Sequence, residues 1–184
     1  NADALRAVLR DIDRHGLHAV INLGDHLSGP MAAHETAELL RARDIVSIKG
    51  NHDRWLTEMP PHQMDTLEAA ALAELSPDHL DWLRALPATA QVTPDIFACH
   101  GTPKSDLTYW TERVTDQGQI VLRDQAEIEA EARGFDATLF LCGHTHLPRR
   151  IDLSGGRVIL NPGSVGCPAY SDDAPQRHNV ETGT

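Results

Sequence analysis

The chain has 184 residues, 41% hydrophobic and 23% charged, which is ordinary for a globular protein and long enough for one real hydrophobic core. The formal net charge of −11 argues against a broad nucleic-acid-binding surface, which would need a basic face. No apolar run approaches the ~20 residues of a membrane span and no secretory leader is visible, so we expect no membrane contact. Cys99, Cys142 and Cys167 are an odd number, and we expect the first two, which lie in strand-like segments, to be small buried hydrophobes. We therefore expect no disulfide and a cytoplasmic protein.

The first half of the chain alternates helical and extended patterns. Apolar residues at helical spacing predict a helix over residues 2–15, and a strand follows over 18–23. Pro30 is placed to begin a second helix, which ends near residue 43 and leads to a strand over 45–49. Because helices alternate with strands, we expect parallel strands joined by crossover helices.

The second half begins with a long helical region and continues with shorter strands. The predicted elements are, in order, helices over 54–88 with a cap at Ser76, a hairpin over 89–99, a polar loop over 102–118, a helix over 119–133, a strand over 137–142, a hairpin of strands 149–153 and 157–160, a turn over 161–164 and a polar tail that could add a strand.

Polar residues follow four of the predicted strands directly. Ligands of open α/β sheets bind at the carboxyl edge that parallel strands share, so we expect these residues to meet. Imidazole is the commonest protein ligand of divalent metals, although two exposed loop histidines would be a simpler interpretation of the last group. The four groups are Gly24-Asp25, Gly50-Asn51-His52-Asp53, His100-Gly101 and Gly143-His144-Thr145-His146.

These groups, in this order, resemble the motifs of the calcineurin-like metallophosphoesterase superfamily. That family's pattern is D-x-H, G-D, G-N-H-[DE], a histidine after a strand, and G-H-x-H; residues 24–146 carry the last four. The turn Asn161-Pro162-Gly163-Ser164 also looks like the small bacterial phosphodiesterase branch. The first block has no counterpart here, so we expect the D-x-H strand to lie upstream of residue 1 and the C-terminal strands to be cut short.

The resemblance implies a fold and a metal centre. The fold would be α/β, a four-layer α/β/β/α sandwich of two mixed sheets flanked by helices, formed as a single domain by residues 1–184. Two divalent metal ions would be bound. Mn is the first candidate, and Fe, Zn or Ni are alternatives, because the ligands offer nitrogen and oxygen but no thiolate. Asp25 would bridge both ions; the other implied ligands are Asn51, His100 and His144 for one and His146 for the other.

The resemblance also implies hydrolysis of a phosphodiester or phosphomonoester by a hydroxide that the two metals share. The substrate would be a phosphorylated small molecule or a phosphodiester. His52 follows the ligand Asn51, and on an extended backbone it would turn away from the metal and face the substrate as general acid. Asp53 would orient His52 through a hydrogen bond; the alternative is that His52 is only a structural turn residue.

Two other functions fit parts of this pattern. Some relatives, such as the retromer scaffold subunit, lack the substrate-facing histidine and bind partner proteins, but His52 is retained here. The catalytic domains of phosphoprotein phosphatases are longer and carry several phosphate-binding arginines. In this chain only Arg54 lies beside the Gly50-Asn51-His52-Asp53 group. Lys104, Arg149 and Arg150 could meet a substrate phosphate or be ordinary surface charges, and His26 could have a supporting role beside Asp25.

Overall fold

The computed structural model describes residues 1–182 and shows two compact units, one over Asn1–Ala88 and a second that begins at Thr89. In the described part of the chain, none of the helices combines the length and the hydropathy that a membrane crossing requires. The prediction of a single domain over 1–184 stays a prediction.

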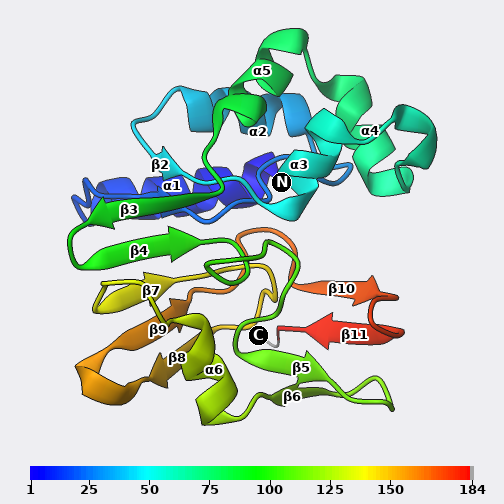
Figure 1. The fold of residues 1–184 in the computed structure, drawn as a ribbon. Coiled ribbons are helices and arrows are strands. Elements are labelled where there is room, and N and C mark those ends of the chain that lie inside the picture. Colours follow the sequence, from blue (N-terminus) through cyan, green and yellow to red (C-terminus); the bar gives the residue numbers. More distant parts are fainter. Residues whose placement is uncertain (183–184) are drawn as a thin grey trace. The chain divides into compact units, whose positions relative to one another are not determined.

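The first unit consists of helices around a short parallel pair of strands (Figure 1). Strands β1 (Ile21–Asn22) and β2 (Val46–Ser47) pair in parallel, with Ile21 opposite Val46. Helix α1 packs against α2, and α3 packs against both α4 and α5. The helices are α1 (Ala2–Arg14), α2 (Ala33–Arg41), α3 (Asn51–Glu58), α4 (Thr66–Glu74) and α5 (Pro77–Ala85), with a 3₁₀ turn over Pro61–Gln63.

Capping residues and an apolar cluster explain these helices. The Asn1 side chain accepts the N–H of Ala4 at the start of α1, and Ser76 caps α5 as its sequence predicted, which satisfies N–H groups that a helix cannot pair internally. The apolar faces of α2, α3, α4 and α5 then share one core, made of Leu27, Ala33, Ala37, Leu56, Ala71 and Leu83.

The start of α3 differs from the prediction. Asn51 and His52 lie in the first helical turn, with Gly50 as the N-cap residue, so the expected extended backbone is wrong here. The cause is Asp53, whose carboxylate accepts the N–H of Gly50 at 2.9 Å and closes the turn. Neighbouring residues on a helix still diverge in direction, by about 100° at 3.6 residues per turn.

A five-stranded mixed sheet organises the second unit, in the order β3-β4-β7-β9-β8. Its three central strands run parallel, and the two edge strands are antiparallel to their neighbours. The carboxyl ends of the central strands therefore share one edge, as predicted. The strands are β3 (Thr89–Thr93), β4 (Ile96–Cys99), β7 (Leu139–Leu141), β8 (Arg149–Asp152) and β9 (Val158–Asn161).

Two antiparallel hairpins complete this unit. The predicted tail strand is confirmed as the hairpin of β10 (Ala169–Asp172) and β11 (His178–Glu181). The helix expected from residue 119 is wrong at its start, because β6 (Ile120–Leu122) pairs with β5 (Glu112–Val114) and α6 covers only Gln125–Glu131.

A tight turn between β5 and β6 explains that error. Gly118 adopts φ +73°, which favours glycine, and its N–H donates to the carbonyl of Thr115 at 2.9 Å. The apolar spacing that resembled one helix over 119–133 instead belongs to one strand, β6, and the shorter helix α6.

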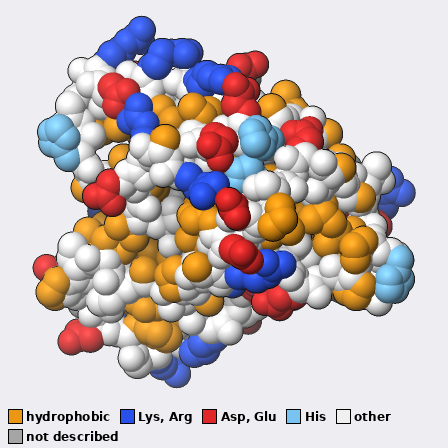
Figure 2. Space-filling view, turned by 90° about the horizontal axis from the view of Figure 1, so that it is seen from above, with side chains coloured by type: hydrophobic (Ala, Val, Ile, Leu, Met, Phe, Trp, Pro, Cys, Tyr) orange, Lys and Arg blue, Asp and Glu red, His pale blue; other side chains and the backbone are white. Residues whose placement is uncertain are grey.

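The core of the second unit lies between the sheet and α6. The Trp110 indole N–H donates to the carbonyl of Ile128 at 3.0 Å and so ties the loop before β5 to this helix. The other fully buried residues of this core include Cys99, Phe140, Cys142 and Ile159. The α/β class is thus confirmed. On the face shown in Figure 2, basic side chains lie among acidic, histidine and apolar ones.

Candidate functional site

The polar residues that follow β1 and β2 come together at the carboxyl ends of this parallel pair. Asp25 Oδ1 accepts the backbone N–H of His52 at 3.0 Å. A Cβ on Gly50 would lie 2.1 Å from the same oxygen, so glycine is the residue that permits this approach. We call Asp25, Asn51, His52 and Asp53 the first half-site; the sequence predicted that these residues would meet, and the structure brings them together.

Asp53 holds the first half-site together. Its side chain is fully buried and accepts three backbone N–H groups, from Asp25 at 2.8 Å, His26 at 2.9 Å and Gly50 at 2.9 Å. It also pairs with the His26 ring, Nδ1 to Oδ2, at 2.8 Å. Asp25 has φ +57°, a left-handed conformation that is costly without glycine. Asp53 therefore stabilises the strained turn that presents Asp25.

His52 has a different partner from the one that the sequence suggested. Its Nδ1 is hydrogen-bonded to the carboxylate of Glu68 on α4, while the Trp55 ring stands edge-on to it at 4.7 Å between centroids. The expected orienting bond from Asp53 is thus corrected: Asp53 binds the Asp25 turn and His26, and Glu68 binds His52. Glu68 is 16 residues away along the chain, so no local motif identified it.

The second half-site consists of His100, His144 and His146. His100 follows β4 and His144 follows β7, two neighbouring parallel strands. The N–H of Gly143 donates to the carbonyl of His100 at 2.7 Å, and the rings of His100 and His144 lie 5.1 Å apart between centroids. The predicted meeting of these two histidines at one sheet edge is confirmed.

The backbone between the two histidines of the last motif bends sharply. His144 has φ +64° and His146 φ +59°, both in the left-handed region that non-glycine residues rarely occupy. Besides glycine, the described residues with positive φ are these two, Asp25 and Ala32. Such conformations cost on the order of 1–3 kcal/mol each and collect at functional sites. Three of the four fall on residues that the sequence predicted to bind metal.

Asn161, at the end of β9, clamps this bend. Its buried amide donates to the carbonyl of Gly143 at 2.8 Å and to the Thr145 hydroxyl at 3.1 Å, and it accepts the N–H of Gly163 at 2.9 Å. The sequence singled out this turn only as a family resemblance. The structure gives it a physical role, which is to hold the His144–His146 turn against the sheet.

The ring of His146 is oriented by the backbone. Its Nδ1 lies 2.9 Å from the carbonyl of Cys167, a contact that requires the proton on Nδ1 and leaves the lone pair on Nε2. Metal-binding histidines commonly use their second nitrogen in this way. His146 therefore has the tautomer that a metal ligand needs.

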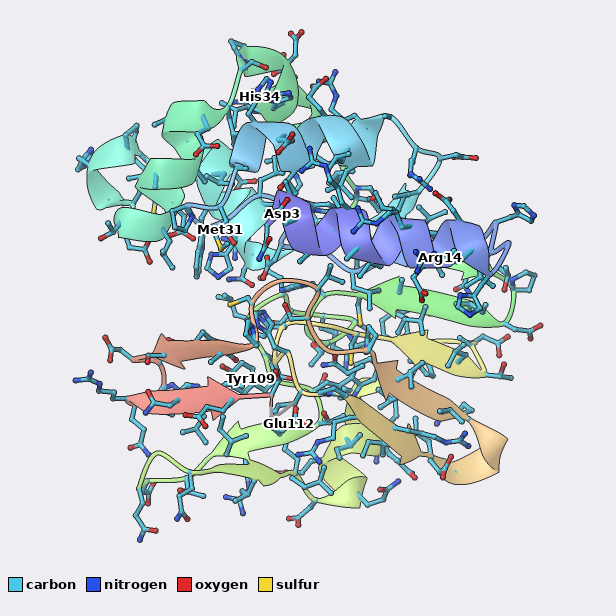
Figure 3. The ribbon with its side chains drawn as sticks, turned by 180° about the vertical axis from the view of Figure 1, so that it is seen from behind. Asp3, Arg14, Met31, His34, Tyr109 and Glu112 are labelled. Carbon is cyan, nitrogen blue, oxygen red and sulfur yellow. The ribbon has the colours of Figure 1, made fainter. Side chains whose placement is uncertain are left out.

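Two tyrosines pack against the second half-site. Tyr109 precedes β5 and lies near Glu112 (Figure 3). Its hydroxyl lies 2.7 Å from the hydroxyl of Tyr170 and 3.0 Å from His178 Nε2. The Tyr109 ring meets His144 edge-on at 5.0 Å, and Tyr170 meets His146 at 4.8 Å. Burial raises the pKa of both phenols, so both are neutral near pH 7.

Arg149 forms a structural ion pair in the second unit. Arg149 Nε donates to the buried carboxylate of Glu112 at 2.8 Å, and Thr111 donates to the other oxygen of that carboxylate. The exposed pairs Lys104–Glu131 and Arg150–Asp152 favour the interpretation of these cations as ordinary surface charges.

Cys99 and Cys142 are buried small hydrophobes, as expected. Both are almost inaccessible, and burial raises the pKa of each thiol. A thiolate ligand is thus disfavoured, and the donors of the two half-sites are carboxylate, amide and imidazole. This donor set fits Mn, Fe, Zn or Ni.

Comparison with known proteins identifies the same family as the motifs. The family described as calcineurin-like phosphoesterase superfamily domain matches residues 1–178. The uncharacterized protein MJ0912 of Methanocaldococcus jannaschii is 26% identical over 91% of this chain and 73% of its own length. A metallophosphoesterase from Sphaerobacter thermophilus is 26% identical with a TM-score of 0.68, covering 97% of this chain and 83% of that one.

The hypothetical protein PH1004 of Pyrococcus horikoshii OT3 shares the fold at lower identity. It has a TM-score of 0.69 at 18% identity, over 99% of this chain and 83% of that one.

Proposed function

Because the chain belongs to the calcineurin-like phosphoesterase superfamily, we propose that it hydrolyses phosphodiesters or phosphomonoesters with the help of two divalent metal ions. The observation that carries this proposal is the coincidence of predicted ligands with strained backbone, at Asp25, His144 and His146. Strain of this kind persists where a function requires it. The proposed substrate is a phosphorylated small molecule or a phosphodiester.

The proposed metal ligands come from both half-sites. Asp25 and Asn51 of the first, and His100, His144 and His146 of the second, would hold the ions, with Mn as the first candidate. When bound, such ions activate water and neutralise charge on the phosphoryl group.

The remaining polar residues of the first half-site act through protons and positions. His52 would donate a proton to the leaving oxygen, a step that typically contributes about 10²–10⁴-fold to a rate. Asp53 keeps the Asp25 turn and the start of α3 in place through four hydrogen bonds. The role of Asp53 is therefore to hold the Asp25 turn and the start of α3, and not to act directly in catalysis as predicted.

The test is an assay of the whole protein on bis-p-nitrophenyl phosphate and on p-nitrophenyl phosphate, with Mn²⁺ and after chelation. We expect hydrolysis that needs metal and a loss of about 10²-fold or more in kcat for Asp25→Asn. His52→Ala should lose less on these two esters, because p-nitrophenolate leaves with little help from a proton, and about 10²-fold on a phenyl or alkyl ester. The control His15→Ala changes an exposed histidine and should leave activity unchanged. Metal content measured on each variant separates lost binding from lost chemistry.

Other outcomes identify the alternatives. Turnover at equal rates by the wild type, Asp25→Asn and His52→Ala would refute the assigned roles. Metal binding without hydrolysis of either ester would favour a non-catalytic scaffold, and a strong preference for a phosphoserine peptide would favour a phosphoprotein phosphatase.

A further inference from the structure

We propose that Glu68 is the positioning residue of His52: it holds the imidazole through Nδ1 so that Nε2 is the nitrogen that serves the leaving group. This inference rests on the proposed function for its kinetic consequence, but the orientation itself follows from the contacts of the first unit. No motif in the sequence pointed to Glu68, which lies on α4 and outside the four polar groups.

Glu68 and Asp53 are the two acidic residues of this unit that are buried. Glu68 is 2% exposed, and its carboxylate pairs with the ring of His52. Removing a carboxyl group from water is costly unless its partners compensate. The Glu68 side chain contacts the His52 ring and the Asp65 side chain. A buried glutamate held in this way indicates a requirement at His52, because a neutral apolar side chain would fill the same space at lower cost.

The pairing determines the tautomer of His52. A carboxyl oxygen that carries no proton can only accept a hydrogen bond, so the contact between Glu68 Oε1 and His52 Nδ1 places the ring proton on Nδ1. The ring then meets any other group through Nε2. A buried aspartate performs the same service for the catalytic histidine of serine proteases, where losing the correct tautomer lowers the rate by about 10⁴-fold.

The surroundings hold Glu68 and His52 in register. Asp65 is the N-cap residue of α4 and accepts the N–H groups of Leu67 at 2.7 Å and Glu68 at 3.1 Å, which fixes the turn from which Glu68 projects. On the other side, the Trp55 ring packs edge-on against His52. The imidazole is thus held by a hydrogen bond in its plane and by an aromatic contact.

Asp53 cannot take this role while it keeps its own partners. Both of its oxygens accept bonds from the Asp25 turn, Gly50 and His26. The two carboxylates consequently divide the work, because Asp53 supports the backbone and Glu68 supports the ring.

Leaving-group dependence distinguishes positioning from simple structural support. A poor leaving group needs a proton from His52, whereas p-nitrophenolate departs readily without one. We expect Glu68→Ala to lower kcat by about 10²-fold for an alkyl or phenyl ester and only a few-fold for the p-nitrophenyl ester, with KM nearly unchanged. Glu68→Gln retains an acceptor oxygen and should recover part of the loss.

The matched control is Glu74→Gln, on the same helix but exposed, which should behave as the wild type on every ester. The double variant His52→Ala/Glu68→Ala should be no slower than His52→Ala alone, because Glu68 acts through His52. Equal losses on all esters, or additive losses in the double variant, would overturn the proposal.

A second readout does not depend on activity. Ring-nitrogen NMR shifts of His52 should show Nδ1 protonated in the wild type and in Glu74→Gln, and a mixture of tautomers in Glu68→Gln and Glu68→Ala. If the wild-type ring already shows the mixture, Glu68 does not position it. If the tautomer changes as expected while no ester is hydrolysed, the orientation stands and the proposed function fails.

Discussion

The two half-sites reach similar ends by different physical means. In the first, one buried carboxylate, Asp53, gathers four donors from two loops. In the second, parallel strands of the sheet deliver the histidines to one edge, and a neutral amide, Asn161, holds the bend between them. The first half-site depends on a charge, whereas the second depends on the sheet beneath it.

This difference predicts unequal sensitivity to substitution. Hydrogen bonds to a charged group contribute about twice as much as neutral ones, and a buried hub leaves several groups unpaired when it is lost. Loss of the neutral Asn161 side chain leaves fewer groups unpaired, and the strands of the sheet keep their backbone hydrogen bonds. Substitutions at Asp53 should therefore cost more than substitutions at Asn161.

The largest effect is expected for Asp53→Ala. Four donors, one of them the ring of buried His26, lose their acceptor, so the free energy of unfolding should fall by about 3–5 kcal/mol. Asp53→Asn keeps one acceptor oxygen and should lose less. Denaturant titration measures both.

The control for this series is Asp3→Ala, whose side chain is 97% exposed and should change stability by less than about 0.5 kcal/mol. A loss at Asp53 no greater than that of the control would show that the hub does not hold the half-site.

The same contrast explains what could be predicted from the sequence. Strand ends that carry Asp25, His100 and His144 were recognisable because apolar runs and glycines mark them locally. The parallel order of β4 and β7 then brought His100 and His144 together. These inferences need only the periodicity of the chain and the rule that parallel strands share an edge.

The remaining features depend on tertiary contacts. Glu68 meets His52 from another helix, and Asp53 was assigned to its neighbour in sequence although its oxygens are occupied by another loop. The hairpin of β5 and β6 differs from the prediction because Ile120 and Leu122 of β6, taken with Ile128 and Ala132, fit a helical period. In each case a partner distant in sequence decided between local alternatives.

A smaller loss is expected for Asn161→Ala, which removes the amide that holds the turn of the second half-site. Loss of the amide leaves the Gly143 carbonyl and the Gly163 N–H without this partner, which should cost about 1–3 kcal/mol in the free energy of unfolding. The strain at His144 and His146 should then relax, so the affinity for Mn²⁺ should also fall.

Asn179→Ala provides the matched comparison, since Asn179 is exposed and accepts one bond from Ser171. It should change neither stability nor metal affinity by more than a small amount. If Asn161→Ala loses no more stability than Asn179→Ala, Asn161 does not hold the turn. If Asn161→Ala loses more stability than Asp53→Ala, the second half-site is the more sensitive of the two.

The smallest effect belongs to the tyrosines that pack on the second half-site, and it appears only at alkaline pH. The chain has two tyrosines, so phenolate absorbance reports Tyr109 and Tyr170 alone. Desolvation raises the pKa of both in the folded protein, above the ordinary value of about 10. The unfolded state therefore releases these protons first, and folding stability is retained below about pH 10 and falls as the pH rises beyond it.

Single substitutions should shift the two phenols in opposite directions. The hydrogen bond between them, 2.7 Å long, lowers the pKa of Tyr109 and raises that of Tyr170. Tyr109→Phe should thus lower the pKa of Tyr170, and Tyr170→Phe should raise that of Tyr109, as followed by absorbance in each variant. In guanidinium chloride both should titrate near about 10. Shifts of the same sign in the two variants would show that the hydrogen bond between the phenols does not move their pKa values in opposite directions.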